Sequence, residues 1–140
     1  MVPKFRAWDK NTNDMVDVKT IDLEKDGSIG CIVDYNGINL DVSECVLMQS
    51  TGLKDKNGVE IFEGDVVRYT WDMLSDVNAT EKGKKVRKSK VFWSDWRASW
   101  AVGKKSCNND LFRYARNGNT VEVIGNIYEN PELLEQADES

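Results

Sequence analysis

The chain has 140 residues, of which 40% are hydrophobic and 31% charged, and its formal net charge at pH 7 is −5. That size and balance are typical of one soluble globular domain and exclude a disordered chain. The sequence contains no histidine, which excludes Ser-His-Asp and Cys-His catalysis and removes the most common ligand of zinc and copper. Its three cysteines form no CxxC spacing, so we expect neither a zinc ribbon nor a disulfide framework.

The sequence also bears on where the protein acts. No apolar run approaches the roughly 20 residues that a membrane-spanning helix needs. The N-terminal stretch MVPKFRAWDK lacks the apolar core of a signal peptide. We therefore predict a cytoplasmic protein that does not bind a membrane.

The charge is spread unevenly along the chain. Between Thr80 and Lys90 six bases accompany one acid, a local charge of +5, so the remaining residues together carry −10. An acidic body argues against general affinity for nucleic acid, because such binding depends on the neutralisation of phosphates. The basic segment is the local exception to that argument.

Short strands separated by turn residues account for the first part of the chain. KFRAW and MVDVKTIDL look like two strands joined by DKNTND, which is rich in turn-forming Asn and Asp. A strand is expected to open into a loop at Gln49 to Gly52. Three dipeptides suit type I′ turns between short apolar runs, and together they predict antiparallel hairpins. These dipeptides are Asp26-Gly27, Asn36-Gly37 and Asn57-Gly58.

A core strand and an insertion follow. After Gly64-Asp65 the residues Val66 to Trp71 alternate with the period of two that marks a half-buried strand. Residues 72–90 are polar and basic, and we predict that they form a mobile insertion.

Trp93, Trp96 and Trp100 have a spacing that fits one face of a helix. Their flanks favour β-structure, however, and Ser94-Asp95 suits a turn. We prefer a hairpin, which spreads the tryptophans over both strands and the turn and leaves at least one of them exposed.

Two short helices are expected near the end. Asn109 or Asp110 can cap LFRYAR, and Asn130 can cap a C-terminal helix that begins with Pro131. The predicted fold is therefore all-β: one domain over residues 1–140, a partly open barrel or pseudo-barrel of short antiparallel strands, with one or two short helices including a C-terminal one.

Three blocks of the sequence carry a resemblance to known proteins: KFRAWDK, LMQSTGLKDKNGVEIFEGDVVRY and EVIGNIYENPELL. Together they resemble the YopX family of phage- and prophage-encoded proteins, and they span nearly the whole chain. The resemblance implies an all-β pseudo-barrel core and a phage or prophage context. It implies no enzymatic activity, no cofactor and no catalytic residues. The insertion departs from the family pattern because it is longer and more basic.

Carboxylates are the remaining candidates for catalysis or metal binding. Glu63 and Asp65, with Asp9 and Asp55 as companions, are of the type that holds a divalent cation or shares acid–base work. The simpler explanation is that an acid in a turn accepts hydrogen bonds from nearby amides. We favour that explanation and predict no metal, no cofactor and no catalytic residue.

The basic segment and the tryptophans remain as candidates for binding. We predict a non-enzymatic phage or prophage accessory protein that binds a host or phage protein and self-associates as a homo-oligomer. The alternative is a single-stranded nucleic-acid-binding protein that uses residues 82–90 and the neighbouring tryptophans. In either case the candidate contact residues are Lys84, Lys85, Arg87, Lys88, Trp93 and Trp96.

Overall fold

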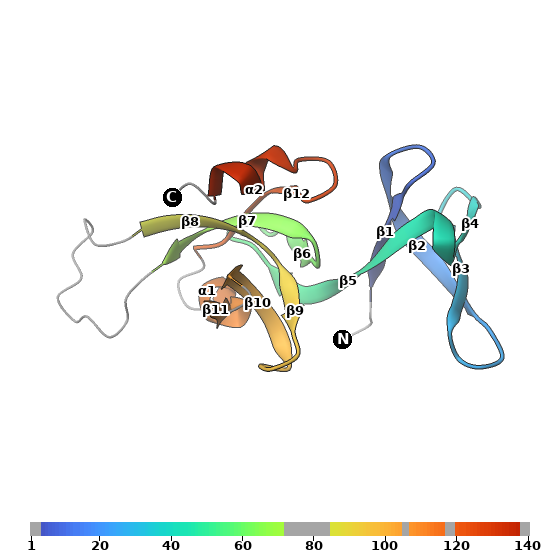
Figure 1. The fold of residues 1–140 in the computed structure, drawn as a ribbon, viewed down its shortest axis with the longest axis horizontal. Coiled ribbons are helices and arrows are strands. Elements are labelled where there is room, and N and C mark those ends of the chain that lie inside the picture. The colour runs from blue at the N-terminus through green and yellow to red at the C-terminus, as the bar shows by residue number, and fades with distance from the viewer. Residues whose placement is uncertain (1–3, 72–84, 105–106, 117–119, 138–140) are drawn as a thin grey trace. The chain divides into compact units, whose positions relative to one another are not determined.

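The computed structural model describes residues 4–71, 85–104, 107–116 and 120–137 (Figure 1). It contains twelve strands and three short helical segments in these ranges. The strands are β1 (Phe5–Asp9), β2 (Asp14–Leu23), β3 (Ile29–Asp34), β4 (Asn39–Asp41), β5 (Cys45–Lys54), β6 (Glu60–Phe62), β7 (Asp65–Trp71), β8 (Lys85–Lys90), β9 (Phe92–Ser94), β10 (Ser99–Lys104), β11 (Cys107–Asp110) and β12 (Glu122–Asn126). The helical segments are η1 (Val42–Glu44), α1 (Leu111–Arg116) and α2 (Glu132–Ala137).

The predicted all-β class with short helices is confirmed. The strands form three sheets, with the orders β4-β3-β2-β1-β5-β6, β11-β10-β9 and β12-β7-β8. Over the described residues these sheets do not close into a barrel. The chain separates into two compact units, Met1–Gly52 and Leu53–Ser140, within the span that the sequence presents as one domain.

The first unit is built around β1, which pairs with β2 on one side and β5 on the other. Ala7 is fully buried and lies opposite Val16 of β2 and Leu47 of β5. Its apolar cluster holds the sheet together because each strand turns alternate side chains toward the same face. The buried members of this cluster are Ala7, Ile32, Leu40 and Cys45.

The turns predicted as type I′ have a different geometry. At the end of β3 the amide of Gly37 donates to the carbonyl of Asp34 at 3.1 Å, and within the turn only the glycine has a positive φ, of 82°. A type I′ turn needs positive φ at both central residues, whereas this is the three-residue loop with glycine in the left-handed position. The cause is Asp34, whose Oδ1 accepts hydrogen bonds from the amides of Asn36 and Ile38 at 2.9 and 2.8 Å.

The same arrangement recurs in the second unit at Asp55. Its Oδ1 accepts from the amides of Asn57 and Val59 at 2.8 and 2.9 Å, and its Oδ2 accepts from the amide of Val123 in β12 at 2.9 Å. The carboxylate is only 3% exposed. It therefore fixes the turn and also ties it to a strand that is distant in the sequence.

The second unit has its own core between the two three-stranded sheets. The rings of Tyr69 on β7 and Tyr114 on α1 lie 4.9 Å apart within it. The two sheets are joined where β8 passes β10. There the Ser89 hydroxyl of β8 accepts a hydrogen bond from the amide of Gly103 in β10 at 2.8 Å. The buried members of this cluster are Ile61, Val67, Tyr69, Val91, Val102, Leu111, Tyr114 and Val121.

The predicted insertion differs in extent from the structure. Residues 72–84 lie outside the described residues, but 85–90 form β8 and pair with β7 over the register Val66↔Lys90 to Trp71↔Lys85. Four of the six residues of this strand are basic, so its sequence has no apolar pattern that would mark a strand. Backbone pairing with β7, rather than an apolar pattern, places it in the sheet.

Both predicted helices are present. Asp110 precedes α1, and its Oδ1 accepts from the amide of Phe112 at 3.1 Å, as a capping residue does. Before α2 the backbone carbonyl of Asn130 accepts from Leu133 at 3.1 Å. The side chain of Asn130 accepts instead from the amide of Asn126 at 3.3 Å, so it binds the preceding strand.

We predict an alkaline loss of stability that comes from Tyr69. Burial and the neighbouring Tyr114 raise the pKa of Tyr69 to about 12, whereas an unfolded tyrosine titrates near pH 10. The contribution of the neutral phenol is thus complete below about pH 10 and is lost as pH rises toward 12. The free energy of unfolding should fall by about 2–3 kcal/mol across that window, and Tyr69→Phe should remove this fall. Urea unfolding at a series of alkaline pH values measures it, and equal falls in the two proteins would contradict the assignment.

Candidate interaction surface

Three of the four candidate carboxylates, Asp9, Asp55 and Asp65, accept hydrogen bonds from backbone amides. Asp65 is 2% exposed, and its Oδ2 accepts from the amide of Phe62 at 2.8 Å. Asp9 likewise accepts from the amide of Asn11 at 2.9 Å. In the part of the chain that the structure describes, no three His, Cys, Asp or Glu residues are grouped so as to hold a metal ion. The simpler explanation of Asp65, as an acid that satisfies local amides, is confirmed.

The expected loop at Gln49 to Gly52 is instead part of a strand. β5 continues to Lys54, and Gly52 takes a positive φ of 79° within it. The Ser50 hydroxyl accepts a hydrogen bond from the Gly52 amide at 3.1 Å and is 5% exposed. This polar group therefore supports the bend that glycine makes in β5, and it is not presented to a ligand.

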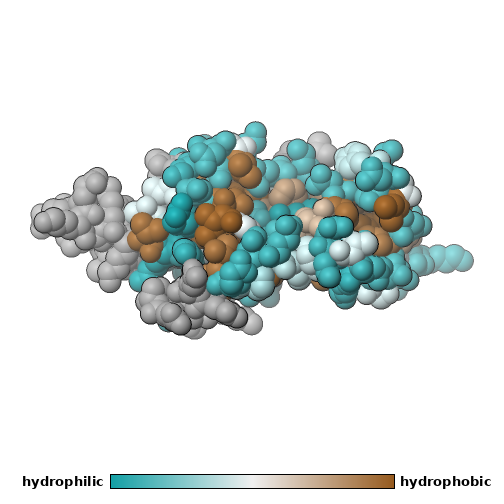
Figure 2. Space-filling view, turned by 90° about the horizontal axis from the view of Figure 1, so that it is seen from above, coloured by the Kyte–Doolittle hydropathy of each residue, from teal (hydrophilic) through white to brown (hydrophobic). Residues whose placement is uncertain are grey.

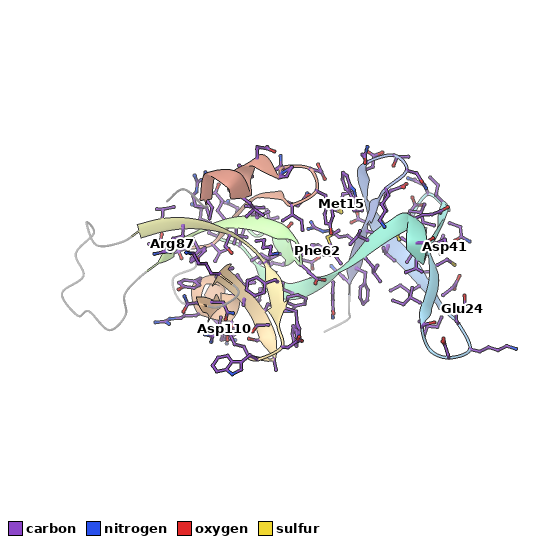
Figure 3. All side chains as sticks on the ribbon, in the orientation of Figure 1. Met15, Glu24, Asp41, Phe62, Arg87 and Asp110 are labelled. Carbon is purple, nitrogen blue, oxygen red and sulfur yellow. The ribbon has the colours of Figure 1, made fainter. Side chains whose placement is uncertain are left out.

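The basic candidates divide between two faces of the β12-β7-β8 sheet. Lys84 lies outside the described residues, and only the backbone of Lys85 is described. Arg87, labelled in Figure 3, lies opposite Tyr69, so it shares the face that turns toward the core cluster. Lys88 lies opposite Arg68 on the other face, because neighbouring residues of a strand point to opposite sides.

An acidic helix covers the face that carries Lys88. α2 packs against β8, and Figure 1 shows it on the opposite side of the sheet from α1. Its first residue is Glu132. Seen from this side in Figure 2, apolar residues of the Leu53–Ser140 unit gather in a band that is flanked by polar residues. The negative charge of α2 beside Lys88 weakens the attraction of this lysine for an external phosphate. Lysines on an edge strand such as β8 also prevent unwanted pairing with other strands.

The tryptophan segment forms the predicted hairpin. Trp93 of β9 lies opposite Trp100 of β10, and their rings meet edge to face at 5.2 Å between centroids. Trp96 lies in the turn and is 87% exposed, while Trp93 is 46% exposed. The prediction of at least one exposed tryptophan is therefore confirmed, and the helical alternative is wrong.

Arg97 fixes the tip of this hairpin. Its Nη2 donates to the backbone carbonyl of Asn108 at 2.7 Å, and its Nε donates to the side-chain oxygen of the same residue. Its guanidinium carbon also lies 5.4 Å from the centroid of the Trp96 ring, within the range of a cation–π contact. The turn is further held by Ser94, whose hydroxyl accepts from the Arg97 amide at 3.3 Å.

The backbone at Ala98 is strained, which gives a second prediction. Ala98 has φ of 52°, a left-handed conformation that costs a residue with a Cβ roughly 1–2 kcal/mol. Ala98→Gly should therefore raise the free energy of unfolding by up to about 1 kcal/mol, after allowance for the greater unfolded-state entropy of glycine. Ala115→Gly, inside α1, is the matched control and should be destabilising. Urea unfolding that shows destabilisation by both substitutions would contradict the strained geometry.

The structure thus separates the candidate residues into two groups. Trp93 and Trp96 share one hairpin, whereas Arg87, Lys88 and the backbone of Lys85 belong to β8 of the β12-β7-β8 sheet. Sequence reasoning missed Arg97 and Asn108, which hold the exposed tryptophan in place. The sequence shows only that Arg97 follows a tryptophan in a predicted turn. That Asn108 of β11 is its hydrogen-bond partner becomes visible only in the folded structure.

Together, the fold and the surface define a class: an all-β protein whose exposed feature is an aromatic hairpin. The family described as YopX protein matches residues 4–135, so the chain belongs to the YopX family. Among solved structures it is similar to the crystal structure of protein EF1440 from Enterococcus faecalis, at 30% identity over 96% of this chain and 99% of that chain, with a TM-score of 0.68. No curated protein gives a match.

The motifs behind the family resemblance have structural roles in this chain. The middle block contains Asp55 and Asp65, which bind backbone amides. In the last block a Cβ on Gly125 would overlap the side chain of Asn130, so this bulged position requires glycine.

Among the described residues none of the helices has the length and apolar character needed to cross a membrane.

Proposed function

We propose that this chain is a non-enzymatic accessory protein that binds a protein partner through the tip of the β9–β10 hairpin. The observation that carries the proposal is Trp96, which is 87% exposed at the end of a hairpin that hydrogen bonds hold in place. Exposing so large an apolar ring to water is unfavourable in the free chain. Burying it against a partner recovers that free energy.

The chemistry of the tip matches that of protein interfaces. Tryptophan and arginine are the residues most enriched among those whose truncation costs most binding energy. Trp96 and Arg97 supply both types side by side. Because Arg97 is already bonded to Asn108, little conformational entropy remains to be lost when a partner binds.

The cellular setting of this binding is also a proposal. Membership of the YopX family supports a phage- or prophage-encoded protein that acts in the bacterial cytoplasm on a host or phage protein. Self-association as a homo-oligomer is supported by β4, which stands at the edge of its sheet, since edge strands pair readily with other chains.

Single-stranded nucleic acid is the second candidate partner. Trp93 and Arg87 are both exposed and would suit base stacking and phosphate contact. They lie on different sheets, however, and α2 covers the face of Lys88. Anisotropy titration of a labelled single-stranded oligonucleotide at about 50 and 200 mM salt decides the matter. Saturable binding that weakens steeply with salt would replace the protein-partner proposal.

Comparative capture from bacterial lysate tests the main proposal. The wild-type chain and Trp96→Ala are immobilised at equal density, and the bound proteins are quantified by mass spectrometry. A partner that the wild type retains and the variant loses, while circular dichroism shows both chains folded, supports the proposal. Identical sets of bound proteins would overturn it.

A further inference from the structure

A second arginine–aromatic pair lies on α1. Phe112 is 45% exposed, and the guanidinium carbon of Arg116 lies 5.2 Å from the centroid of its ring. The two residues are four apart and so share one side of the helix. Leu111 and Tyr114 face the core instead. α1 therefore presents outward the same combination of ring and guanidinium as the hairpin tip.

The two pairs are connected by β11. Arg97 of the hairpin donates two hydrogen bonds to Asn108, which lies in β11 opposite Gly103 of β10. β11 then runs directly into α1 through Asp110, whose carboxylate accepts from the Phe112 amide. Figure 1 shows β11 and α1 beside the β9–β10 hairpin, and Figure 3 marks Asp110 at their junction. We call the residues Trp96, Arg97, Phe112, Arg113 and Arg116 the hairpin–α1 surface; Arg113 is half-buried and the other four are exposed.

The charge of this region is opposite to that of the rest of the chain. Residues 95–116 contain five bases and two acids, a net charge of +3, so from the total of −5 the remaining residues carry −8. One of the two acids, Asp110, is engaged with the backbone of α1. This region therefore attracts negative charge, as the basic segment Thr80–Lys90 also does, whereas the other residues together repel it.

We propose that the hairpin–α1 surface binds an acidic segment of the partner protein. Trp96 and Phe112 are the apolar anchors, and Arg113 and Arg116 select for Asp and Glu beside the apolar groups of the partner. Arg97 donates two hydrogen bonds to Asn108 and serves to position Trp96. This inference rests on the proposed function and adds the chemical class of the partner.

Two pairs of substitutions separate charge selection from general charge effects. Arg113→Glu with Arg116→Glu reverses the charge of the surface. Lys19→Glu with Lys25→Glu makes the same change in net charge on exposed positions of the Met1–Gly52 unit. Because basic residues in the last turn also favour the helix dipole, Arg113→Gln with Arg116→Gln is included as a milder variant, and circular dichroism checks the fold of each chain.

The probe is a random dodecapeptide library displayed on phage and selected on the immobilised full chain. We expect the selected peptides to combine Asp or Glu with apolar residues. Their affinity should fall at least tenfold or so on Trp96→Ala and on charge reversal at Arg113 and Arg116, and remain unchanged on reversal at Lys19 and Lys25. Peptides that need Trp96 but lack acids and ignore the arginine substitutions would overturn this inference and leave the proposed function standing. A selection that yields no Trp96-dependent peptide would overturn both.

Discussion

Asp55→Ala is expected to lower the free energy of unfolding of the Leu53–Ser140 unit by about 3–5 kcal/mol. The carboxylate accepts three amide hydrogen bonds, from Asn57, Val59 and Val123, while almost fully buried. Its removal leaves these donors without their acceptor, and the one from Val123 joins the turn to β12. Urea unfolding gives the free energy, and hydrogen exchange at Val123 reports the lost link directly.

Two other turn acids serve as graded controls for Asp55. Asp34 accepts two amides within its own turn, so Asp34→Ala should destabilise less. Asp26 is exposed and accepts from the amide and hydroxyl of Ser28, so Asp26→Ala should destabilise the least of the three. Three equal effects would show that the link between Asp55 and β12 contributes nothing.

The second large effect is expected on binding. Trp96→Ala should weaken the complex with the partner by about 2–4 kcal/mol, or about 30- to 900-fold in Kd. The same substitution should change the free energy of unfolding by less than about 0.5 kcal/mol, because the ring is exposed in the free chain. Isothermal titration calorimetry with the captured partner measures the first quantity, and urea unfolding measures the second.

Trp100→Ala is the contrasting variant for Trp96. Trp100 packs against the core cluster and against the edge of Trp93, so its truncation should mainly reduce stability, by about 3–5 kcal/mol at most. An unchanged Kd for Trp96→Ala would contradict the assigned anchor, even if the hairpin remained folded.

Local patterns predict those elements that local forces determine. From Val67 on, β7 alternates because Val67 and Tyr69 enter the core while Arg68 is exposed, and that period of two is visible in the sequence. Val66 is also fully buried, so the start of the strand is covered on both faces. The hairpin at Trp96 and the cap at Asp110 also depend on residues within a few positions of one another. The turn at Asn36-Gly37 also depends on nearby residues, but its type differs from the predicted type I′. The acid two residues earlier decides the hydrogen bonds, and the dipeptide rule ignores it.

Features that depend on distant residues were not predictable in this way. β8 looked like an insertion because its lysines and arginine give no apolar period, and its partner β7 supplies the order. The bond from Arg97 to Asn108 joins two strands of a sheet, so neither residue signals the other in the sequence. The sequence predicts that at least one tryptophan of the hairpin is exposed, but only the fold shows that Trp96 is the most exposed one.

The central claim is that the partner binds at the hairpin–α1 surface. Hydrogen exchange followed by mass spectrometry, with and without the captured partner, measures which amides become protected. We predict protection across residues 94–100 and 107–116 and none across β8. Protection of β8 or of the Met1–Gly52 unit, with the hairpin unprotected, would contradict the account.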